Sequence, residues 1–201
     1  VQSGMTGEEN AFTGDFNFLE TFCPEAHLLD DLVDTLGSHY EISITNIKRF
    51  SVGSPIQAAA DAMVQLVEEH KLKAEDIEHI AVSLPPMGAK IVNGRTMPDV
   101  NLQYALAAIL LDDGKLTFAA THDYDRLSSP DIVALMARTS LHGDPALQHL
   151  EAKRPARLNV TLRNGGDLEK YVPAVRGTAD NPMTKQEVES KCLDLLSGVI
   201  G

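Results

Sequence analysis

The sequence has no tryptophan, two cysteines and only 5% aromatic residues, and 17 basic side chains stand against 29 acidic ones. The resulting formal net charge of −12 argues against a nucleic-acid-binding protein, because neutralising phosphates needs a clustered basic surface. It equally argues against an anionic membrane surface as a partner. No apolar run approaches the roughly 20 residues of a membrane-spanning helix. Cys23 and Cys192 lie far apart without a Cys-x-x-Cys spacing, so we expect neither a disulfide framework nor a zinc knuckle.

Several short motifs of catalysis and binding are also missing. There is no glycine-rich phosphate loop ending in Gly-Lys-Ser/Thr and no Gly-x-Gly-x-x-Gly, so no nucleotide site is indicated. The absence of a Gly-x-Ser-x-Gly elbow weakens the case for a serine hydrolase. The seven histidines are scattered without metal-ligand spacing, and we expect no metal site. No basic leader followed by an apolar segment is visible, so we expect a cytoplasmic protein.

What remains is a globular composition, with 43% hydrophobic and 23% charged residues over 201 positions. Alternating apolar residues predict strands, and apolar residues at helical spacing predict helices. The expected strands cover residues 39–47, 80–84, 158–162 and 171–175, the last two forming a hairpin around Asn164-Gly165-Gly166. The expected helices cover residues 28–36, 54–67, 101–111, 129–136 and 184–196, and residues 87–98 are expected to be a loop.

Two of the expected helices carry start signals. Ser54 is placed to cap the first of them, with Gln57 completing a capping box, and Thr184 and Glu187 have the same spacing at the last one. The pattern predicts an α+β fold, in which helices cover a small mixed sheet and helical segments flank it at both ends.

Three polar clusters are candidates for chemistry, and each also has an ordinary structural interpretation. Lys48 and Arg49 lie where a strand is expected to lead toward a helix start, and they could bind an anion or form a solvated surface pair. Arg95 precedes Tyr104, which could equally be a core tyrosine among leucines and alanines. The third cluster, residues 122–126, could be a surface cap. None of the three by itself specifies a reaction.

The order of these clusters nevertheless resembles a known family. The sequence Lys48-Arg49-Phe50 leads into Ser-Pro-Ile-Gln-Ala-Ala-Ala-Asp-Ala, and Arg-Thr-Met-Pro-Asp, Asn-Leu-Gln-Tyr and Leu-Leu-Asp-Asp-Gly follow in turn. Arg176-Gly177-Thr178, Asn181-Pro182-Met183-Thr184 and Lys191 close the series. Together they resemble the C-terminal part of the MmgE/PrpD family, which includes 2-methylcitrate dehydratase, cis-aconitate decarboxylase and iminodisuccinate epimerase.

The resemblance implies a division of the chain into three parts. Residues 1–37 would be the end of a larger all-helical domain, residues 38–177 an α/β lid domain, and residues 178–201 a helix that returns to the helical domain. The active site of such proteins lies between the helical domain and the lid. The helical half, in this chain or in a separate subunit, is therefore an expected partner, in a homodimer or a heteromer.

The resemblance also implies roles for four residues. Lys48 matches a lid lysine of the active site and Tyr104 matches an active-site tyrosine, so both are expected to be catalytic. Arg95 is expected to hold a carboxylate of the substrate, and Ser54 is also expected to bind substrate. One difference stands out, because the decarboxylases have a histidine shortly after the lysine, where this chain has Val52-Gly53-Ser54.

The implied function is that of a cofactor-independent lyase or isomerase. It would act on a small di- or tricarboxylate by removing a proton next to a carboxylate, with dehydration, decarboxylation and epimerisation left open. An ammonium group near that carboxylate would stabilise the developing negative charge without a metal. The alternative is a non-catalytic binding or interaction subunit that keeps the lid fold.

Overall fold

The computed structural model describes residue 4 and residues 11–13, 17–18 and 34–200. The chain separates into two units, Val1–Ile44 and Thr45–Gly201, which are described one at a time. In the first unit, the rings of Phe12 and Phe18 meet edge to face, with their centroids 6.0 Å apart. The helix predicted over residues 28–36 falls largely outside the described residues, and residues 34–38 form a turn.

The described residues form helices and the four strands of one sheet. In chain order the elements are η2 (Glu41–Ile44), η3 (Ser54–Ile56), α2 (Gln57–His70), η4 (Ala74–Asp76), β1 (Ile77–Leu84), α3 (Pro86–Val92), η5 (Pro98–Val100), α4 (Leu102–Leu111), α5 (Phe118–Thr121), η6 (Arg126–Ser128), α6 (Pro130–Met136), β2 (Thr139–Gly143), η7 (Pro145–Lys153), β3 (Ala156–Leu162), β4 (Asp167–Val172) and α7 (Lys185–Ile200). The elements written η are 3-10 helices. All but η2 belong to the second unit.

The sheet of the second unit has the strand order β2-β1-β3-β4. Strand β2 is parallel to β1, whereas β3 is antiparallel to both β1 and β4, so the sheet is mixed. Ile80 pairs with Val160 and Val82 with Leu158, and all four side chains are fully buried. Since alternate residues of a strand face opposite sides of a sheet, this register buries one face and leaves the other to polar residues.

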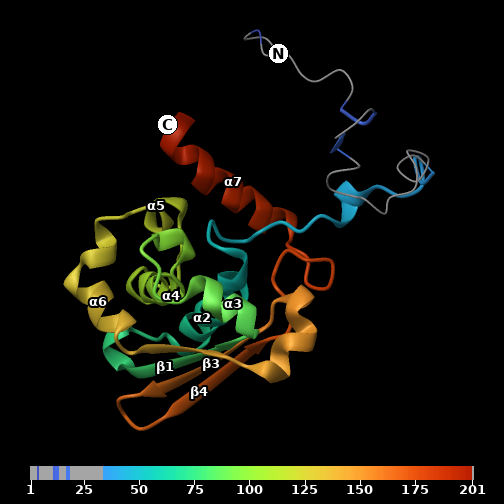
Figure 1. Cartoon of the computed structure of the whole chain (residues 1–201). Coiled ribbons are helices and arrows are strands. Elements are labelled where there is room, and N and C mark those ends of the chain that lie inside the picture. The colour runs from blue at the N-terminus through green and yellow to red at the C-terminus, as the bar shows by residue number, and fades with distance from the viewer. Residues whose placement is uncertain (1–3, 5–10, 14–16, 19–33, 201) are drawn as a thin grey trace. The chain divides into compact units, whose positions relative to one another are not determined.

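Helices α2 and α4 cover the buried face of the sheet (Figure 1). Residues 102–110 of α4 are buried on all sides of the helix, which makes α4 the central helix of the core. The Asn101 side chain caps α4 by accepting a hydrogen bond from the backbone N–H of Tyr104 at 2.9 Å. No helix within the described part of the chain is both long and apolar enough to span a bilayer.

The predicted α+β class is therefore confirmed, with a small mixed sheet and helices over it. The strand predicted over residues 80–84, the hairpin of β3 and β4, and helices α4, α6 and α7 are all present. The second strand of the hairpin, predicted over residues 171–175, begins earlier and covers Asp167–Val172. The capping box of α7 is also present, because Thr184 Oγ1 accepts from the backbone N–H of Glu187 and Glu187 Oε2 accepts from that of Thr184.

The prediction of a strand over residues 39–47 is wrong. Residues 41–44 form the 3-10 helix η2, and residues 45–48 have no regular structure. Tyr40, Ile42 and Ile44 alternate as in a strand but are 50%, 79% and 53% exposed. Alternation stabilises a strand only where a neighbouring strand and a core face are available, and these side chains have no such burial.

Three further predictions are corrected. The fourth strand of the sheet is β2, which the sequence pattern did not indicate because its five residues do not alternate clearly. The loop predicted over residues 87–98 begins with helix α3, whose start uses Pro86 in its first turn. At the start of α2, neither Ser54 nor Ile56 caps the helix with its side chain, and Gln57 turns away to the preceding loop.

Candidate active site

Lys48 lies on the irregular segment that leads into η3 and α2, and its side chain is exposed. Its ammonium group is 3.4 Å from the backbone carbonyl of Val52, a long and therefore weak hydrogen bond. The next side chain, Arg49, turns the other way, into the body of the domain. The two adjacent cations of the sequence therefore have different environments, and Lys48 is the one presented to solvent.

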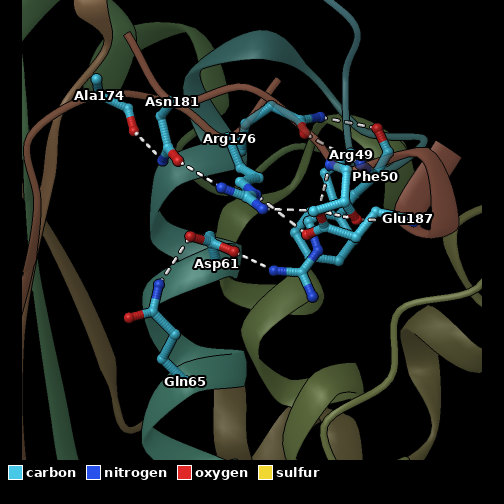
Figure 2. Close-up of polar contacts among 10 residues, drawn as sticks. Arg49, Phe50, Asp61, Gln65, Ala174, Arg176, Asn181 and Glu187 are labelled. Carbon is cyan, nitrogen blue, oxygen red and sulfur yellow. Dashed lines mark hydrogen bonds and ion pairs between the residues drawn. The ribbon is translucent and has the colours of Figure 1, made fainter. Parts of the chain in front are cut away.

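Arg49 forms an ion pair with Asp61 of α2 (Figure 2). The Asp61 side chain is only 4% exposed, and its second carboxylate oxygen accepts from Gln65 Nε2 at 2.8 Å. The Arg49 guanidinium also lies over the ring of Phe50, 4.9 Å from its centroid. The ion pair therefore attaches Arg49, the residue after Lys48, to helix α2.

The Gln57 side chain fastens the same loop a second time. Its Oε1 accepts from the backbone N–H of Phe50 at 3.1 Å, and its Nε2 donates to the carbonyls of Phe50 at 2.8 Å and Val52 at 3.1 Å. Gln57 is buried, so it satisfies three backbone groups of the loop inside the domain. The amide of Gln57 thus orders the loop that begins at Lys48.

Helix α7 supplies a third attachment. Arg176 binds both carboxylate oxygens of Glu187, at 3.1 and 2.7 Å, and Asn181 Oδ1 at 2.8 Å (Figure 2). One turn further along the helix, the Lys191 ammonium donates to the backbone carbonyl of Lys48. Asp194 accepts from the backbone N–H of Phe118 at 2.7 Å. The first half of α7 is therefore tied to the domain beside Lys48.

A groove of about 550 Å³ lies between α7, α2 and this loop. Three cationic side chains, Arg49, Lys115 and Lys191, and three acidic ones, Glu68, Glu187 and Asp194, line it. The Arg176 guanidinium bonded to Glu187 holds the pKa of that carboxyl down at about 2. Burial lowers the pKa of Lys191, and the nearby Lys48 ammonium lowers it further.

Ser54 is the first residue of η3, and Arg95 lies in the segment between α3 and η5. The backbone N–H of Gly53 donates to the carbonyl of Asp99 at 2.7 Å, which joins the segment just before η3 to η5. Ser54 lines a second pocket of about 390 Å³, together with Arg154 and with Gly88 and Ile91 of α3. The Arg95 guanidinium donates to the carbonyls of Ile91 at 2.6 Å and Lys90 at 3.0 Å, and its side chain is exposed.

Tyr104 is a fully buried residue of α4. Its hydroxyl donates to the backbone carbonyl of Ala120 at 2.6 Å, and it lines neither of the two pockets. Burial raises the pKa of the phenol, partly offset by the positive charge of Arg126, so the group is a neutral hydrogen-bond donor at physiological pH. The structure thus brings Lys48 and Tyr104 into separate environments.

Asp61, Gln57 and Lys191 are residues of this site to which the sequence analysis gave no role in the site. Gln57 was predicted to cap a helix, and Asp61 and Lys191 were only part of the family motifs. Asp61 left a signal, since it is the one charged residue within the run of alanines that forms the buried stripe of α2. A charge in such a stripe requires a buried partner, because an unpaired buried carboxylate is strongly unfavourable. Lys191 belongs to the family motifs, but no sequence signal indicates its contact with Lys48, which is 143 positions away.

Within the described residues, no group of three or more His, Cys, Asp or Glu side chains is arranged to hold a metal ion. A comparison with curated proteins found no match. A comparison with family models matched residues 50–201 to the MmgE/PrpD C-terminal domain. Lys48 lies two residues before the matched range. Because the match covers most of its length, the chain belongs to the MmgE/PrpD family, whose members are generally dehydratases and other lyases.

Proposed function

We propose that this chain is the C-terminal lid part, or lid subunit, of a cofactor-independent lyase or isomerase that acts on a small di- or tricarboxylate. The reaction would start with removal of a proton next to a carboxylate and lead to dehydration, decarboxylation or epimerisation. The observation that carries the proposal is the environment of Lys48. Its side chain is exposed, whereas the backbone around it is fastened by Gln57, Arg49 and Lys191.

Such a fixed cation suits this chemistry. Removing a proton next to a carboxylate builds enolate-like negative charge, and a preorganised ammonium group lowers the energy of that charged transition state. Arg95 and Ser54 support the proposal as substrate-binding residues, since the Gly53–Asp99 hydrogen bond joins the residue before Ser54 to η5, which follows Arg95 in the chain. The Arg95 guanidinium has five N–H donors, of which the carbonyls of Ile91 and Lys90 accept two. The remaining N–H groups can donate to a substrate carboxylate.

The surface of α7 supports the proposal of a helical partner. In the C-terminal half of α7, the apolar side chains Leu193, Leu196 and Ile200 are 70%, 46% and 70% exposed, and this end of the helix extends away from the sheet (Figure 1). An apolar helix face of this kind is stabilised by packing against other helices. We propose that it packs on the helical half, in a homodimer or heteromer in the cytoplasm.

One observation favours a second candidate function. Gly53, in the segment where the decarboxylases carry a histidine, has no side chain, and its N–H is already bonded to Asp99. A chain without that histidine could bind a carboxylate without turning it over. The second candidate is therefore a non-catalytic binding or interaction subunit with the lid fold.

The test uses the complete protein, with the helical half expressed in the same chain or together with it. Citrate, 2-methylcitrate, cis-aconitate and iminodisuccinate are incubated with it in D₂O, and proton NMR follows C–H exchange, alkene formation and loss of CO₂. We expect turnover of at least one acid, and a loss of about 10² to 10³-fold in Lys48→Ala. Lys185→Ala, at a 90% exposed lysine, is the matched control and should keep full activity.

The possible outcomes separate the two candidates. Full activity of Lys48→Ala would remove Lys48 from the mechanism. Specific thermal stabilisation by one acid without any turnover would favour the binding subunit over the enzyme, since a ligand that binds the folded state stabilises it by mass action. Turnover by this chain alone would contradict the need for a helical partner.

A further inference from the structure

Lys191 makes an unusual contact for a lysine on a helix surface. Its ammonium group donates to the backbone carbonyl of Lys48 instead of pointing into solvent. We propose that Lys191 is a positioning residue, which holds the Lys48 loop in the place where the Lys48 ammonium meets the substrate. The proposal rests on the proposed function of Lys48 and extends it to α7.

Lys191 sits between two fixed points on α7. Glu187 lies four residues before it and is paired with Arg176, and Asp194 lies three residues after it and accepts from the N–H of Phe118. Residues at these spacings lie on one face of a helix, so all three side chains face the domain. The position of Lys191 is therefore set by contacts on both sides of it.

The contact is a charge-assisted hydrogen bond. Lys191 is half-buried, and a hydrogen bond from an ammonium group is stronger than one between neutral groups. The charged groups that line the same groove are Arg49, Glu68, Lys115, Glu187 and Asp194, with the Cys192 thiol also close to Lys191. The described structure gives no ion pair between Lys191 and any of these carboxylates, so its hydrogen bond goes to the loop carbonyl.

Together, the contacts hold the loop at three successive residues. Lys191 binds the carbonyl of Lys48, Asp61 binds the side chain of Arg49, and Gln57 binds both backbone groups of Phe50. Removing Lys191 removes the contact at Lys48 and leaves the contacts at Arg49 and Phe50 in place. A catalytic group that is misplaced by a fraction of an ångström loses rate more than it loses binding.

A spectroscopic experiment on the chain tests the contact without any assay of activity. Labelling with carbonyl-¹³C lysine and ¹⁵N arginine gives signals only from Lys-Arg peptide bonds, which occur at Lys48-Arg49 and Lys153-Arg154. We expect Lys191→Met to shift the Lys48 carbonyl signal and to leave the Lys153 signal, an internal control, in place. Lys191→Arg, which keeps a charged donor, should shift it less. An unchanged Lys48 signal in Lys191→Met would overturn the contact.

Kinetics of the complete protein test the role. We expect Lys191→Met to lower kcat by about 10-fold or more with KM nearly unchanged, and Lys191→Arg to restore most of the rate. The double variant Lys48→Ala/Lys191→Met should be no slower than Lys48→Ala alone, because Lys191 acts through Lys48. A rise in KM with kcat unchanged would instead make Lys191 a substrate ligand, and additive losses would overturn the positioning role.

The two proposals fail in different ways. If Lys48→Ala is fully active, the proposed function of Lys48 fails, whatever the NMR signal of its carbonyl shows. If Lys48→Ala is inactive but Lys191→Met is as active as the parent protein, only the role of Lys191 fails. Equal thermal unfolding midpoints of the parent, Lys191→Arg and Lys191→Met proteins exclude a general loss of folding as the cause.

Discussion

Arg49 and Asp61 form an ion pair that joins the loop of Lys48 to helix α2, with the carboxylate almost completely buried and the guanidinium 27% exposed. The pair explains why a charged residue can lie within the alanine-rich buried stripe of α2. It also gives Arg49 a structural role, whereas the neighbouring side chain of Lys48 is exposed to solvent.

Replacing Asp61 by asparagine should destabilise the protein by about 2 to 3 kcal/mol. The substitution leaves the Arg49 guanidinium without its buried counter-charge, and breaking a buried pair is costly, although the exposed part of Arg49 reduces the cost. Urea unfolding at neutral pH measures the change. The matched control is Lys185→Ala, which removes the exposed pair with Glu189 and should change stability by less than about 0.5 kcal/mol. Equal effects of the two variants would contradict the role given to Asp61.

The Arg176–Glu187 pair should make stability depend on pH in the acid range. The pKa of Glu187 falls from its ordinary value of 4.5 to about 2 in the folded protein, so its contribution is complete above about pH 4.5 and is lost as the pH falls toward 2. Because both side chains are about a quarter exposed, we expect a contribution of about 1 to 2 kcal/mol. Glu187→Gln should be less stable than the parent protein at neutral pH by this amount, and the gap should close on acidification.

The control for that measurement is Glu189→Gln, at an exposed position of the same helix. Its stability should follow that of the parent protein across the acid range. A gap between parent and Glu187→Gln that stays constant down to about pH 2 would show that the carboxylate charge of Glu187 does not stabilise the fold.

Gly177 allows the chain to approach residue 47 closely, and alanine should not be tolerated there. Gly177 has a φ of +94°, and an added Cβ would lie 1.8 Å from the carbonyl oxygen of Ile47. Gly165 has a similar φ of +85° but open space around its Cα, so Gly165→Ala measures the backbone strain alone. We expect about 1 kcal/mol of destabilisation for Gly165→Ala and about 1 to 3 kcal/mol more for Gly177→Ala.

Thermal unfolding of the two glycine variants, compared side by side, measures this difference. Gly177→Ala should also displace the segment just before Lys48, since the backbone N–H of Ile47 donates to the carbonyl of Gly177 at 2.8 Å. Equal losses of stability in the two variants would mean that the clash with the Ile47 carbonyl adds nothing to the cost of the left-handed backbone conformation.

Replacing Tyr104 by phenylalanine should cost about 1 to 2 kcal/mol of stability. The variant removes the 2.6 Å hydrogen bond and leaves the Ala120 carbonyl buried without its donor. The same variant tests the expected catalytic role of Tyr104, because activity can be measured well below the unfolding midpoint. A loss of turnover of about 10²-fold or more in the folded variant would support that role, and unchanged turnover would leave Tyr104 as a core residue.

The chemistry of the candidate site was predictable from the sequence only in part. The motif order pointed to Lys48, Ser54, Arg95 and Tyr104 and to the family to which the chain belongs. The contacts that hold Lys48 in place were not predictable, since they join residues up to 143 positions apart. Gln57 illustrates the limit, because its spacing from Ser54 predicts a helix cap, yet its amide binds the backbone of Phe50 instead.

Local patterns determined the fold class, the hairpin of β3 and β4, and the starts of α4, α6 and α7, because each depends on residues a few positions apart. Tertiary structure alone decided that residues 139–143 form a strand and residues 39–47 do not, since a strand exists only where a neighbour offers hydrogen bonds and a core offers burial. It also separated Lys48 from Arg49, one exposed and one paired with Asp61. Arg49 is paired and Lys48 is exposed because the Asp61 carboxylate, on helix α2, lies within reach of Arg49.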